Sequence, residues 1–332
     1  MILESPGVSP LLAIDVAAEV ARICQGIRDT VFGQLRRKGV VVGVSGGIDS
    51  TVVAALAVRA LGKERVFALF TPEMDSSDDS LRFGQMVADW LEIASSIEDI
   101  SPILKAAGCY RRRNEAIRSA VPEFTDDYKC KLVLPNMLEA GRYPIFSIVV
   151  HSPSGEVKKV RLPLNAYLGI VAATSFKQRT RKMMEYYYAD LLQFAVAGTP
   201  NRLEYDQGFF VKNGDGAADL KPIAHLYKTQ VYELAGYLGV PEEIQQRPPT
   251  TDTYSLPQSQ EEFYFSLPLD KMDLCLYGKD HGILPEELGR MIGLQTDQVS
   301  RVYDMIDSKR RASLYLHMPP VVFASLEWSP VS

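Results

Sequence analysis

The chain has 332 residues and a formal net charge of −5, a length that allows one large or two smaller domains with a sizeable core. The negative charge argues against general nucleic-acid binding, so basic residues that contact an anionic substrate have to cluster locally. The four cysteines, Cys24, Cys109, Cys130 and Cys275, are far apart and form no CxxC pair. We therefore expect reduced, buried thiols rather than zinc ligands or disulfides.

The amino terminus and the hydropathy pattern predict an unprocessed cytoplasmic protein. Glu4 and Pro6 lie where a signal peptide needs basic residues and the start of an apolar run. No uninterrupted apolar run approaches the roughly 20 residues that cross a bilayer. We therefore expect no association with membranes.

Residues 11–38 place apolar side chains at steps of three, four or seven, which is typical of one face of a helix. Gly39 can end this helix. The pattern then changes to strand, helix, strand, helix, strand, over residues 40–44, 51–61, 66–70, 76–91 and 97–100. This alternation predicts an α/β fold with a Rossmann-like parallel sheet, helices on both faces, and ligands at the carboxyl ends of the strands.

The hexapeptide Ser45-Gly46-Gly47-Ile48-Asp49-Ser50 lies between the first strand and its helix. A glycine-rich turn in this setting leaves unpaired backbone N–H groups that bind an anion. Ser45 and Ser50 can add hydroxyl donors, and Asp49 can hold the magnesium ion that accompanies a polyphosphate. The spacing does not match a Walker P-loop. It resembles the SGGxDS pyrophosphate loop of the N-type ATP pyrophosphatases, which cleave ATP between the α and β phosphates.

Residues 101–173 carry little that points to chemistry. We interpret Arg111-Arg112-Arg113 as a solvated helix face. Residues 145–150 and 157–162 flank Ser152-Pro153-Ser154-Gly155, which predicts a β-hairpin. No repeat, low-complexity segment or linker marks an independent second domain.

A helix is predicted to resume near Ser175. Residues two apart on a regular helix lie about 200° apart, so Arg179 and Arg181 cannot both face one ligand. Arg179 and Tyr186, seven positions apart, can share a face. By itself this pair would be typical of a surface helix.

Several polar segments follow in order, and singly each is typical of turns and helix caps. They are Ala197-Gly198-Thr199 with Glu204, Val211-Lys212-Asn213-Gly214-Asp215, Ala218–Ile223, Leu226–Val231 and Pro248–Asp252. Together with the hexapeptide they closely resemble the NAD synthetase family, whose pattern is GTxNxxE, TKxGD, LxKTQV and PTADL. The resemblance runs from about Val40 to Asp252, skips the hairpin region and weakens toward Lys309-Arg310. It implies an adenine nucleotide α-hydrolase-like, N-type ATP pyrophosphatase fold.

The resemblance also implies a reaction and roles for residues. In this family a substrate carboxylate attacks the α-phosphorus of ATP, pyrophosphate leaves, and ammonia displaces AMP to give an amide. The implied catalytic residues are Asp49, Lys228 and Thr250, and the implied magnesium ligands are Asp49 and Glu204. The implied ATP and pyrophosphate contacts are Ser45, Gly46, Gly47, Ser50, Thr199, Lys228 and Thr250. The implied deamido-NAD contacts are Arg179, Tyr186, Lys212, Asp215, Asp219 and Lys309.

Some positions depart from the family pattern. Phe83-Gly84 stands where relatives often carry an Asp-Ala pair, and Ser308 stands where the terminal HKR signature has its histidine. An acidic element survives only as Ser259-Gln260-Glu261-Glu262, and PTADL is Pro249-Thr250-Thr251-Asp252-Thr253. These changes keep the phosphate chemistry and leave the acyl substrate open.

Three hypotheses follow for the function. The first is an ammonia-dependent NAD synthetase that uses ATP, Mg²⁺, deamido-NAD and ammonia. The second is a related AMP-forming amide ligase that acts on another carboxylate. The third is a nucleotide-binding regulator without catalysis, against which the intact Asp49, Glu204, Lys228 and Thr250 count.

The expected organisation is a single NAD synthetase-like domain over residues 1–332. It includes an inserted hairpin region at about 108–173 and a C-terminal helical and tail region at about 255–332. The family resemblance implies a homodimer. Because no Cys-centred glutaminase unit is visible, ammonia is expected to come free or from a separate glutaminase.

Overall fold

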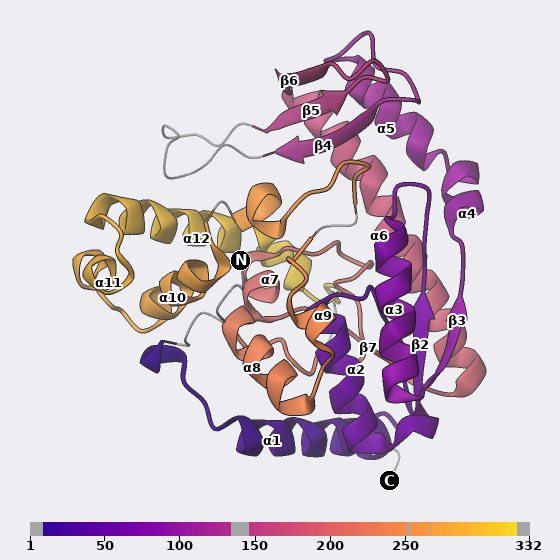
Figure 1. Cartoon of the computed structure of the whole chain (residues 1–332), viewed down its shortest axis with the longest axis vertical. Coiled ribbons are helices and arrows are strands. Elements are labelled where there is room, and N and C mark those ends of the chain that lie inside the picture. Colours follow the sequence, from indigo (N-terminus) through magenta and orange to yellow (C-terminus); the bar gives the residue numbers. More distant parts are fainter. Residues whose placement is uncertain (1–8, 134–145, 251–252, 266, 324–332) are drawn as a thin grey trace.

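The computed structural model of the chain describes residues 9–133, 146–250, 253–265 and 267–323. A parallel sheet with helices on both faces forms its centre (Figure 1), and a smaller antiparallel sheet lies beyond one end of the helical layer.

The central sheet has four parallel strands in the order β3-β2-β1-β7. Their bounds are β1 Val40–Gly43, β2 Val66–Phe70, β3 Ala94–Ile97 and β7 Ala195–Ala197. In the register of β1, Val40 pairs with Val66 on one side and with Ala195 on the other. The predicted parallel sheet is confirmed. The third strand begins at Ala94 instead of Ile97, because it is an edge strand without buried residues and its two serines break the apolar pattern.

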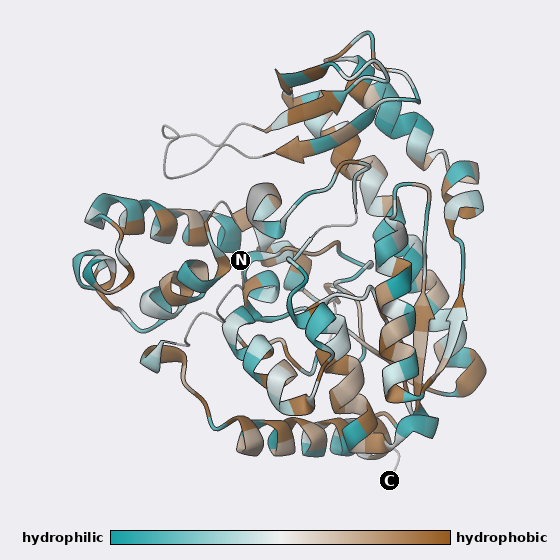
Figure 2. Ribbon diagram, viewed as in Figure 1, coloured by the Kyte–Doolittle hydropathy of each residue, from teal (hydrophilic) through white to brown (hydrophobic). Residues whose placement is uncertain are grey.

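Alternate residues of β1 face two helical layers. Val40 and Val42 belong to a core that includes side chains of α1 Val16–Arg28, α2 Ile48–Leu61, α3 Asp78–Leu91 and α8 Lys228–Leu238. Val41 faces the other side, against Ala189 of α6 Leu164–Leu192. Figure 2 shows many helices with a brown and a teal side, as expected when one face packs on a sheet and the other meets solvent.

The first helix is shorter than predicted. The Asp15 side chain accepts a hydrogen bond from the backbone N of Ala18 and so fixes the start of α1 at Val16. After Arg28 the helix widens into the π-helical turn η2 Asp29–Gln34. The residues before it form the separate 3-10 turn η1 Pro10–Leu12.

Two helices that border the cavity begin earlier than predicted. α2 begins at Ile48 and not at Thr51, so Asp49 and Ser50 lie in its first turn. α6 begins at Leu164 and not near Ser175, and it has 29 residues. Its first half packs on α5 and its second half on the central sheet, so no single periodic face runs through it.

The smaller sheet consists of β4 Lys129–Val133, β5 Ser147–His151 and β6 Val157–Arg161, paired antiparallel in that order. The predicted hairpin is confirmed as β5 and β6. β4 is not predicted, because Lys129 and Lys131 give it the appearance of a surface segment. Its buried side chains form a core with α5 Cys109–Arg118 and the first turns of α6, and α4 Ser101–Ala106 precedes α5.

The C-terminal part is helical. α10 Leu269–Asp280, α11 Pro285–Ile292 and α12 Thr296–His317 share a core with η1 and α7 Arg202–Gln207. The remaining short elements are η3 Lys63–Arg65, α9 Glu242–Gln245 and η4 Glu261–Phe265.

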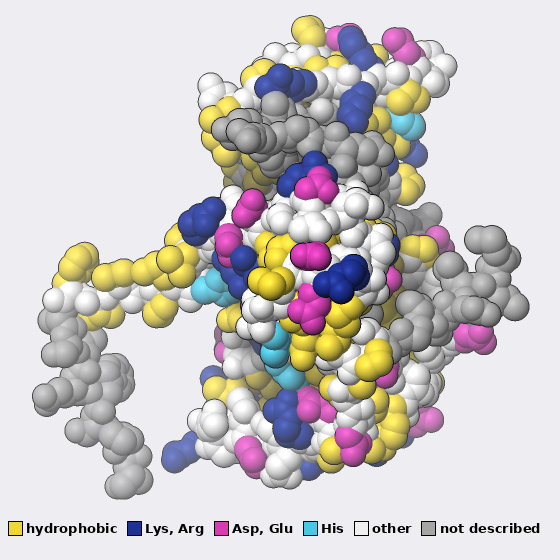
Figure 3. All heavy atoms as spheres, turned by 90° about the vertical axis from the view of Figure 1, so that its left-hand side faces the viewer, with side chains coloured by type: hydrophobic (Ala, Val, Ile, Leu, Met, Phe, Trp, Pro, Cys, Tyr) yellow, Lys and Arg dark blue, Asp and Glu magenta, His cyan; other side chains and the backbone are white. Residues whose placement is uncertain are grey.

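The surface and the thiols agree with the composition. Basic and acidic side chains are intermixed on the face that Figure 3 shows. All four cysteines are free and buried, as predicted. Among the described residues, no helix combines the length and the hydropathy that a bilayer span requires.

Candidate active site

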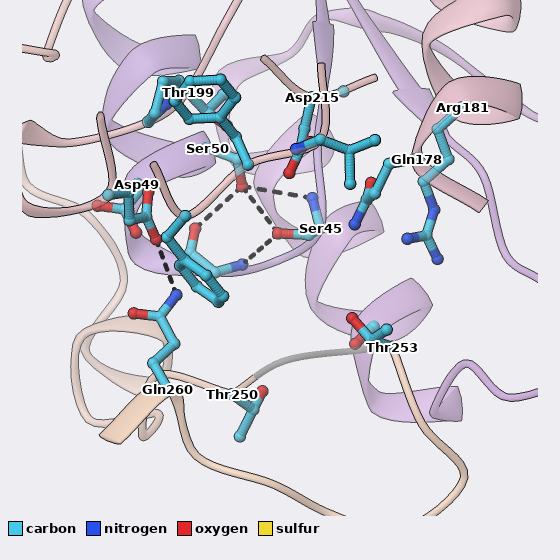
Figure 4. A pocket seen from close by; sticks show the side chains of 18 of the residues that line it. Ser45, Asp49, Ser50, Gln178, Arg181, Thr199, Asp215, Thr250, Thr253 and Gln260 are labelled. Atoms are coloured by element: carbon cyan, nitrogen blue, oxygen red, sulfur yellow. Dashed lines mark hydrogen bonds between the residues drawn. The ribbon is translucent and has the colours of Figure 1, made fainter. Parts of the chain in front are cut away.

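A cavity of about 460 Å³ lies at the carboxyl ends of β1 and β2. Its walls come from the loop after β1, one face of α6, the first residues of α7 and α8, and parts of the segment 247–264. Figure 4 shows this cavity from close by. The residues predicted from the sequence that line it are Ser45, Gly47, Asp49, Ser50, Thr199, Glu204, Asp215, Lys228 and Thr250.

Ser45 and Ser50 hold the glycine loop at the start of α2. Ser50 Oγ donates to the carbonyl O of Gly47 at 3.1 Å and accepts from the backbone N of Ser45 at 3.3 Å. The backbone N of Gly47 donates to Ser45 Oγ, also at 3.3 Å. Bonds of this length are weak, so phosphate oxygens can replace the serine oxygens as acceptors for these two N–H groups.

Gly46 serves the packing of the loop. Its φ is +70°, and a Cβ at this position would lie 2.5 Å from Cβ of Phe83. Gly46 itself is not among the cavity-lining residues. Phe83-Gly84, which departs from the family pattern, therefore packs against the back of the loop.

Lys228 and Asp49 form a buried ion pair in the cavity wall. Lys228 is the first residue of α8, and its side chain is 3% exposed. Burial opposes the charge of Lys228, but the carboxylates of Asp49 and Glu204 outweigh it and raise the pKa of the ammonium. Asn201 Nδ2 donates to Asp49 Oδ1 at 3.1 Å, so Asp49 is held from two sides.

Among the described residues, the hydrogen bonds to the Glu204 carboxylate come from amide groups. Oε1 accepts from Gln260 Nε2 at 2.9 Å, and Oε2 accepts from the backbone N of Asn201 at 3.3 Å. Burial, and next the negative charge of Asp49, raise the pKa of Glu204 to about 8. The group formed by Asp49, Glu204 and Lys228 thus has two carboxylates for one ammonium.

Asn201 and Gln260 were not predicted as site residues. Asn201 and Glu204 form a capping box at the start of α7, and the spacing N-x-x-E before a helix is a sequence signal that could have identified Asn201. Gln260 lies in the altered acidic element, and nothing in its local pattern indicates that it reaches Glu204.

The other predicted residues of the cavity lie in loops. Thr250 forms an isolated antiparallel bridge with Ser259, and its side chain is exposed at the cavity (Figure 4). Asp215 Oδ1 accepts from the backbone N of Val211 at 2.7 Å, and burial raises the pKa of Asp215. The predicted residues Thr251 and Asp252 lie outside the described part of the chain.

The remaining predicted substrate contacts are not among the cavity-lining residues. Tyr186 Oη donates to Asp219 Oδ1 at 3.3 Å, and burial raises the pKa of Tyr186 to about 12. Arg179 Nε donates to the carbonyl O of Lys212 at 3.3 Å. These four residues have partners on their own chain, and their contact with a substrate stays a prediction.

Lys212 and Lys309 reach backbone oxygens of the C-terminal part. Lys212 Nζ donates to the carbonyl O of Tyr315 at 2.6 Å. Lys309 Nζ donates to the carbonyl O of Tyr264 at 2.6 Å and lies over its ring, and burial lowers the pKa of Lys309 to about 7. Tyr264 lines the cavity, so Lys309 supports the cavity wall from behind.

α6 presents a polar row that was not predicted. Gln178, Arg181, Lys182 and Glu185 line the cavity, and Figure 4 shows the first two projecting from the helix. The spacing predicted Arg179 on the substrate side, whereas Arg181 lines the cavity. The row has steps of three, one and three, a pattern typical of one helical face.

A second buried charge cluster lies between α5, α6 and the segment after β2. Lys177 Nζ donates to Glu73 Oε1 at 2.8 Å, to Asp75 Oδ2 at 2.6 Å and to the carbonyl O of Thr253 at 2.7 Å. Thr253 lines the cavity, so this cluster adjoins the site.

Arg113 and Tyr110 complete the second cluster. Arg113 pairs with Asp75, and Tyr110 Oη donates to Glu73 Oε2 at 2.9 Å. The interpretation of 111–113 as a solvated face is therefore wrong for Arg113, which is 6% exposed because it turns toward Asp75. Burial alone would raise the pKa of Asp75, but Lys177 and Arg113 hold it below the ordinary value.

Known proteins resemble this chain over most of its length. It is 60% identical over 312 residues to the NH(3)-dependent NAD(+) synthetase of Mesorhizobium japonicum, covering 94% of this chain and 98% of that protein. It is 58% identical over 316 residues to the protein of the same name from Rhizobium meliloti, covering 95% and 94%.

Solved structures share the fold. An NH3-dependent NAD synthetase from Campylobacter jejuni has a TM-score of 0.61 at 24% identity, covering 94% of this chain and all of that one. An NMN synthetase from Francisella tularensis has a TM-score of 0.60 at 23% identity, covering 93% and 99%. The NAD synthase family model matches residues 19–121 and 149–312, more than half of the chain. The chain therefore belongs to the NAD synthase family.

Proposed function

We propose that this chain is an ammonia-dependent NAD synthetase. It adenylates the nicotinate carboxylate of deamido-NAD with ATP and then amidates the adenylate with ammonia. The relatives of about 60% identity support this activity over nearly the whole chain. The observation that carries it is the convergence of the glycine loop with Asp49, Glu204 and Lys228 on one cavity.

The glycine loop binds the leaving group. A carboxylate oxygen of deamido-NAD attacks the α-phosphorus of ATP, the bond to the bridging oxygen breaks, and pyrophosphate leaves. The N–H groups of Ser45 and Gly47 and the hydroxyl of Ser50 donate to its oxygens, and Lys228 adds positive charge. Ammonia nitrogen then attacks the acyl carbon and loses a proton, and the carbon–oxygen bond to AMP breaks.

Asp49 and Glu204 would hold a magnesium ion. Magnesium takes one or two carboxylates together with phosphate oxygens and water. The raised pKa of Glu204 indicates that its negative charge beside Asp49 is not fully compensated, and such an ion would compensate it. When bound, the ion would offset the negative charge of the triphosphate. Thr250, at the cavity mouth, would donate to a phosphate oxygen.

The organisation of the protein belongs to the same proposal. The chain is a single domain of the cytoplasm, with the smaller sheet as an insertion, and it takes ammonia free or from a separate glutaminase. It works as a homodimer, which the exposed apolar side chains Met183, Tyr187 and Leu191 of α6 support. Exposed apolar side chains after α12 also point away from the body (Figure 3).

One assay tests the activity. The purified protein is incubated with ATP, magnesium, ammonium and deamido-NAD, and both pyrophosphate and NAD are followed. We expect equal amounts of the two products. A second candidate is amidation of another nicotinate nucleotide, because the departures from the family pattern at Ser259-Gln260-Glu261-Glu262 and Ser308 leave the acyl substrate open. Turnover with the mononucleotide but none with deamido-NAD would overturn the first candidate.

A further inference from the structure

The smaller sheet contributes apolar side chains to the cavity from a stretch that the family model does not match. The model leaves residues 122–148 unmatched, and Leu132 and Phe146 lie in this stretch and line the cavity. Tyr167, Val171 and Phe263 line it with them. We name these five residues the apolar wall.

Two rings of the apolar wall are already stacked. The rings of Phe146 and Tyr167 have centroids 4.1 Å apart and planes 18° apart. The carbonyl O of Phe146 accepts from the backbone N of Leu162 at 3.0 Å, which fixes Phe146 beside the hairpin. Leu132 and Tyr167 also pack on the core of the smaller sheet, so the wall is held in place before a ligand binds.

The apolar wall and the glycine loop lie toward different ends of the cavity. Along α6 the lining residues run from Tyr167 to Glu185, which at 1.5 Å per residue is about 27 Å. Glu185 contacts the backbone next to the glycine loop, since a Cβ on Gly43 would lie 2.8 Å from its Oε1. The cavity thus has a charged end and an apolar, aromatic end.

The smaller sheet also holds the segment that follows Thr250. The backbone N of Cys130 donates to Ser255 Oγ at 2.9 Å, and the backbone N of Leu256 donates to the carbonyl O of Cys130 at 3.2 Å. Cys130 and Leu132 both lie in β4. The strand therefore connects the apolar wall to the segment around Ser255 and Leu256.

Resting on the proposed function, we propose that the Phe146–Tyr167 stack binds a planar heteroaromatic ring of one of the two nucleotide substrates. The ring is the adenine of ATP or the adenine of deamido-NAD, since the charged nicotinate ring has to reach the α-phosphorus at the other end. A nucleotide held by its phosphates at the charged end extends an uncharged flat ring away from them, and such a ring stacks well on aromatic side chains. The wall consists of uncharged side chains, so it suits the ring and not the phosphates.

The test is a steady-state comparison of wild type, Phe146→Ala and Phe146→Tyr. We expect Phe146→Ala to raise the KM for one nucleotide about 5- to 160-fold, the range for losing one aromatic stacking partner of a base. The other KM and the kcat should stay within about threefold of wild type. Phe146→Tyr keeps the flat ring and should restore the KM. The substrate whose KM rises identifies the ring.

The matched control is Phe32→Ala, because Phe32 is a half-exposed phenylalanine outside the cavity lining. It should change neither KM. Unchanged KM values in Phe146→Ala overturn the inference. An equal rise in both KM values together with a lower melting temperature also overturns it, since this would show a structural role alone. If wild type makes no NAD, the proposed function fails before the variants are compared; if it makes NAD and Phe146→Ala is normal, only this inference fails.

Discussion

The charge clusters around Lys228 and Lys177 both bury two carboxylates beside a lysine, but only the second adds an arginine. Glu73 and Asp75 face Lys177 and Arg113, so positive and negative charges are equal in number. In the described part of the chain, Asp49 and Glu204 have Lys228 as their single cation. The clusters adjoin one cavity, and they differ in charge balance more than in residue type.

The pKa values follow this balance. In the Lys177 cluster the two cations hold the pKa of Asp75 low in spite of burial. In the Lys228 group the pKa of Glu204 rises to about 8 because burial and Asp49 both oppose its charge. A balanced buried cluster stabilises the positions of its elements, whereas an unbalanced one has capacity for a further cation. We therefore propose that the Lys177 cluster is structural and that the Lys228 group is functional.

The largest effect is expected on activity, from substitution of Asp49 in the Lys228 group. Asp49→Ala is expected to abolish adenylation and leave the fold intact, and Asp49→Asn keeps the size of the side chain while removing its charge. We expect pyrophosphate release to fall by about a thousandfold or more, because the change removes a proposed magnesium ligand and the carboxylate that pairs with Lys228. Initial rates of pyrophosphate release measure this.

The control for Asp49 is Asp79→Asn, which changes an exposed carboxyl on α3. It should keep the wild-type rate. An Asp49 variant that retains most of its rate would refute the metal-binding role of Asp49. It would also refute the proposal that the Lys228 group is the functional one of the two clusters.

The next effect concerns stability. Lys177→Met leaves Glu73 and Asp75 buried with Arg113 as their remaining cation, and breaking a buried pair in this way costs about 3–5 kcal/mol. We expect the urea midpoint to fall accordingly, while the kcat of the folded variant stays near wild type. Urea unfolding followed by fluorescence measures the change.

Lys63→Met provides the matched control, since Lys63 pairs with Glu92 on the surface. Its midpoint should match wild type. If Lys177→Met were as stable as wild type but inactive, the Lys177 cluster would be part of the catalytic machinery, and the comparison would fail.

The sequence predicts the Lys228 group better than the Lys177 cluster for a physical reason. The glycine loop after a strand predicts Asp49, whereas the family resemblance implies Glu204 and Lys228. All three residues lie in the first turn of a helix. The parallel sheet brings such ends together, so their convergence can be predicted from topology.

The Lys177 cluster has no such signals. Arg113 and Lys177 lie inside helices, and their burial depends on how α5 packs on α6. A three-residue basic run carries no information on which of its members turns inward. The apolar wall is similar, because β4 pairs with a hairpin 13 residues later in the chain, and this pairing depends on long-range contacts.

A smaller effect concerns how the stability of the protein depends on pH through Glu204. Because the pKa of Glu204 in the folded state is about 8 against an ordinary 4.5, folding takes up a proton between these values. Wild-type stability should therefore fall as pH rises from 4.5 to 8. Glu204→Gln cannot titrate, so at pH 8 we expect it to be more stable than wild type by roughly 4 kcal/mol.

The same variant should lose activity, about a hundredfold, because an amide is a poor magnesium ligand. Urea unfolding without magnesium at pH 4.5 and pH 8 measures the stability difference, which should vanish at the lower pH. Asp126→Asn serves as a control on an exposed carboxyl. Equal stability of Glu204→Gln and wild type at pH 8 would contradict the unbalanced charge.

The smallest effect tests whether the Lys177 cluster is balanced by its cations or depends on every partner. Tyr110→Phe removes one hydrogen bond to Glu73, while Lys177 stays on the other carboxylate oxygen. Losing a hydrogen bond to a charged group costs about 1.5 kcal/mol, so the urea midpoint should fall less than in Lys177→Met. Tyr128→Phe is the matched control, because the Tyr128 ring packs on Phe124 away from the cluster. If Tyr110→Phe lowered the urea midpoint as much as Lys177→Met, losing a neutral hydroxyl would cost as much stability as losing an ammonium. The Tyr110 hydroxyl, and not the balance of charges, would then hold Glu73 in place.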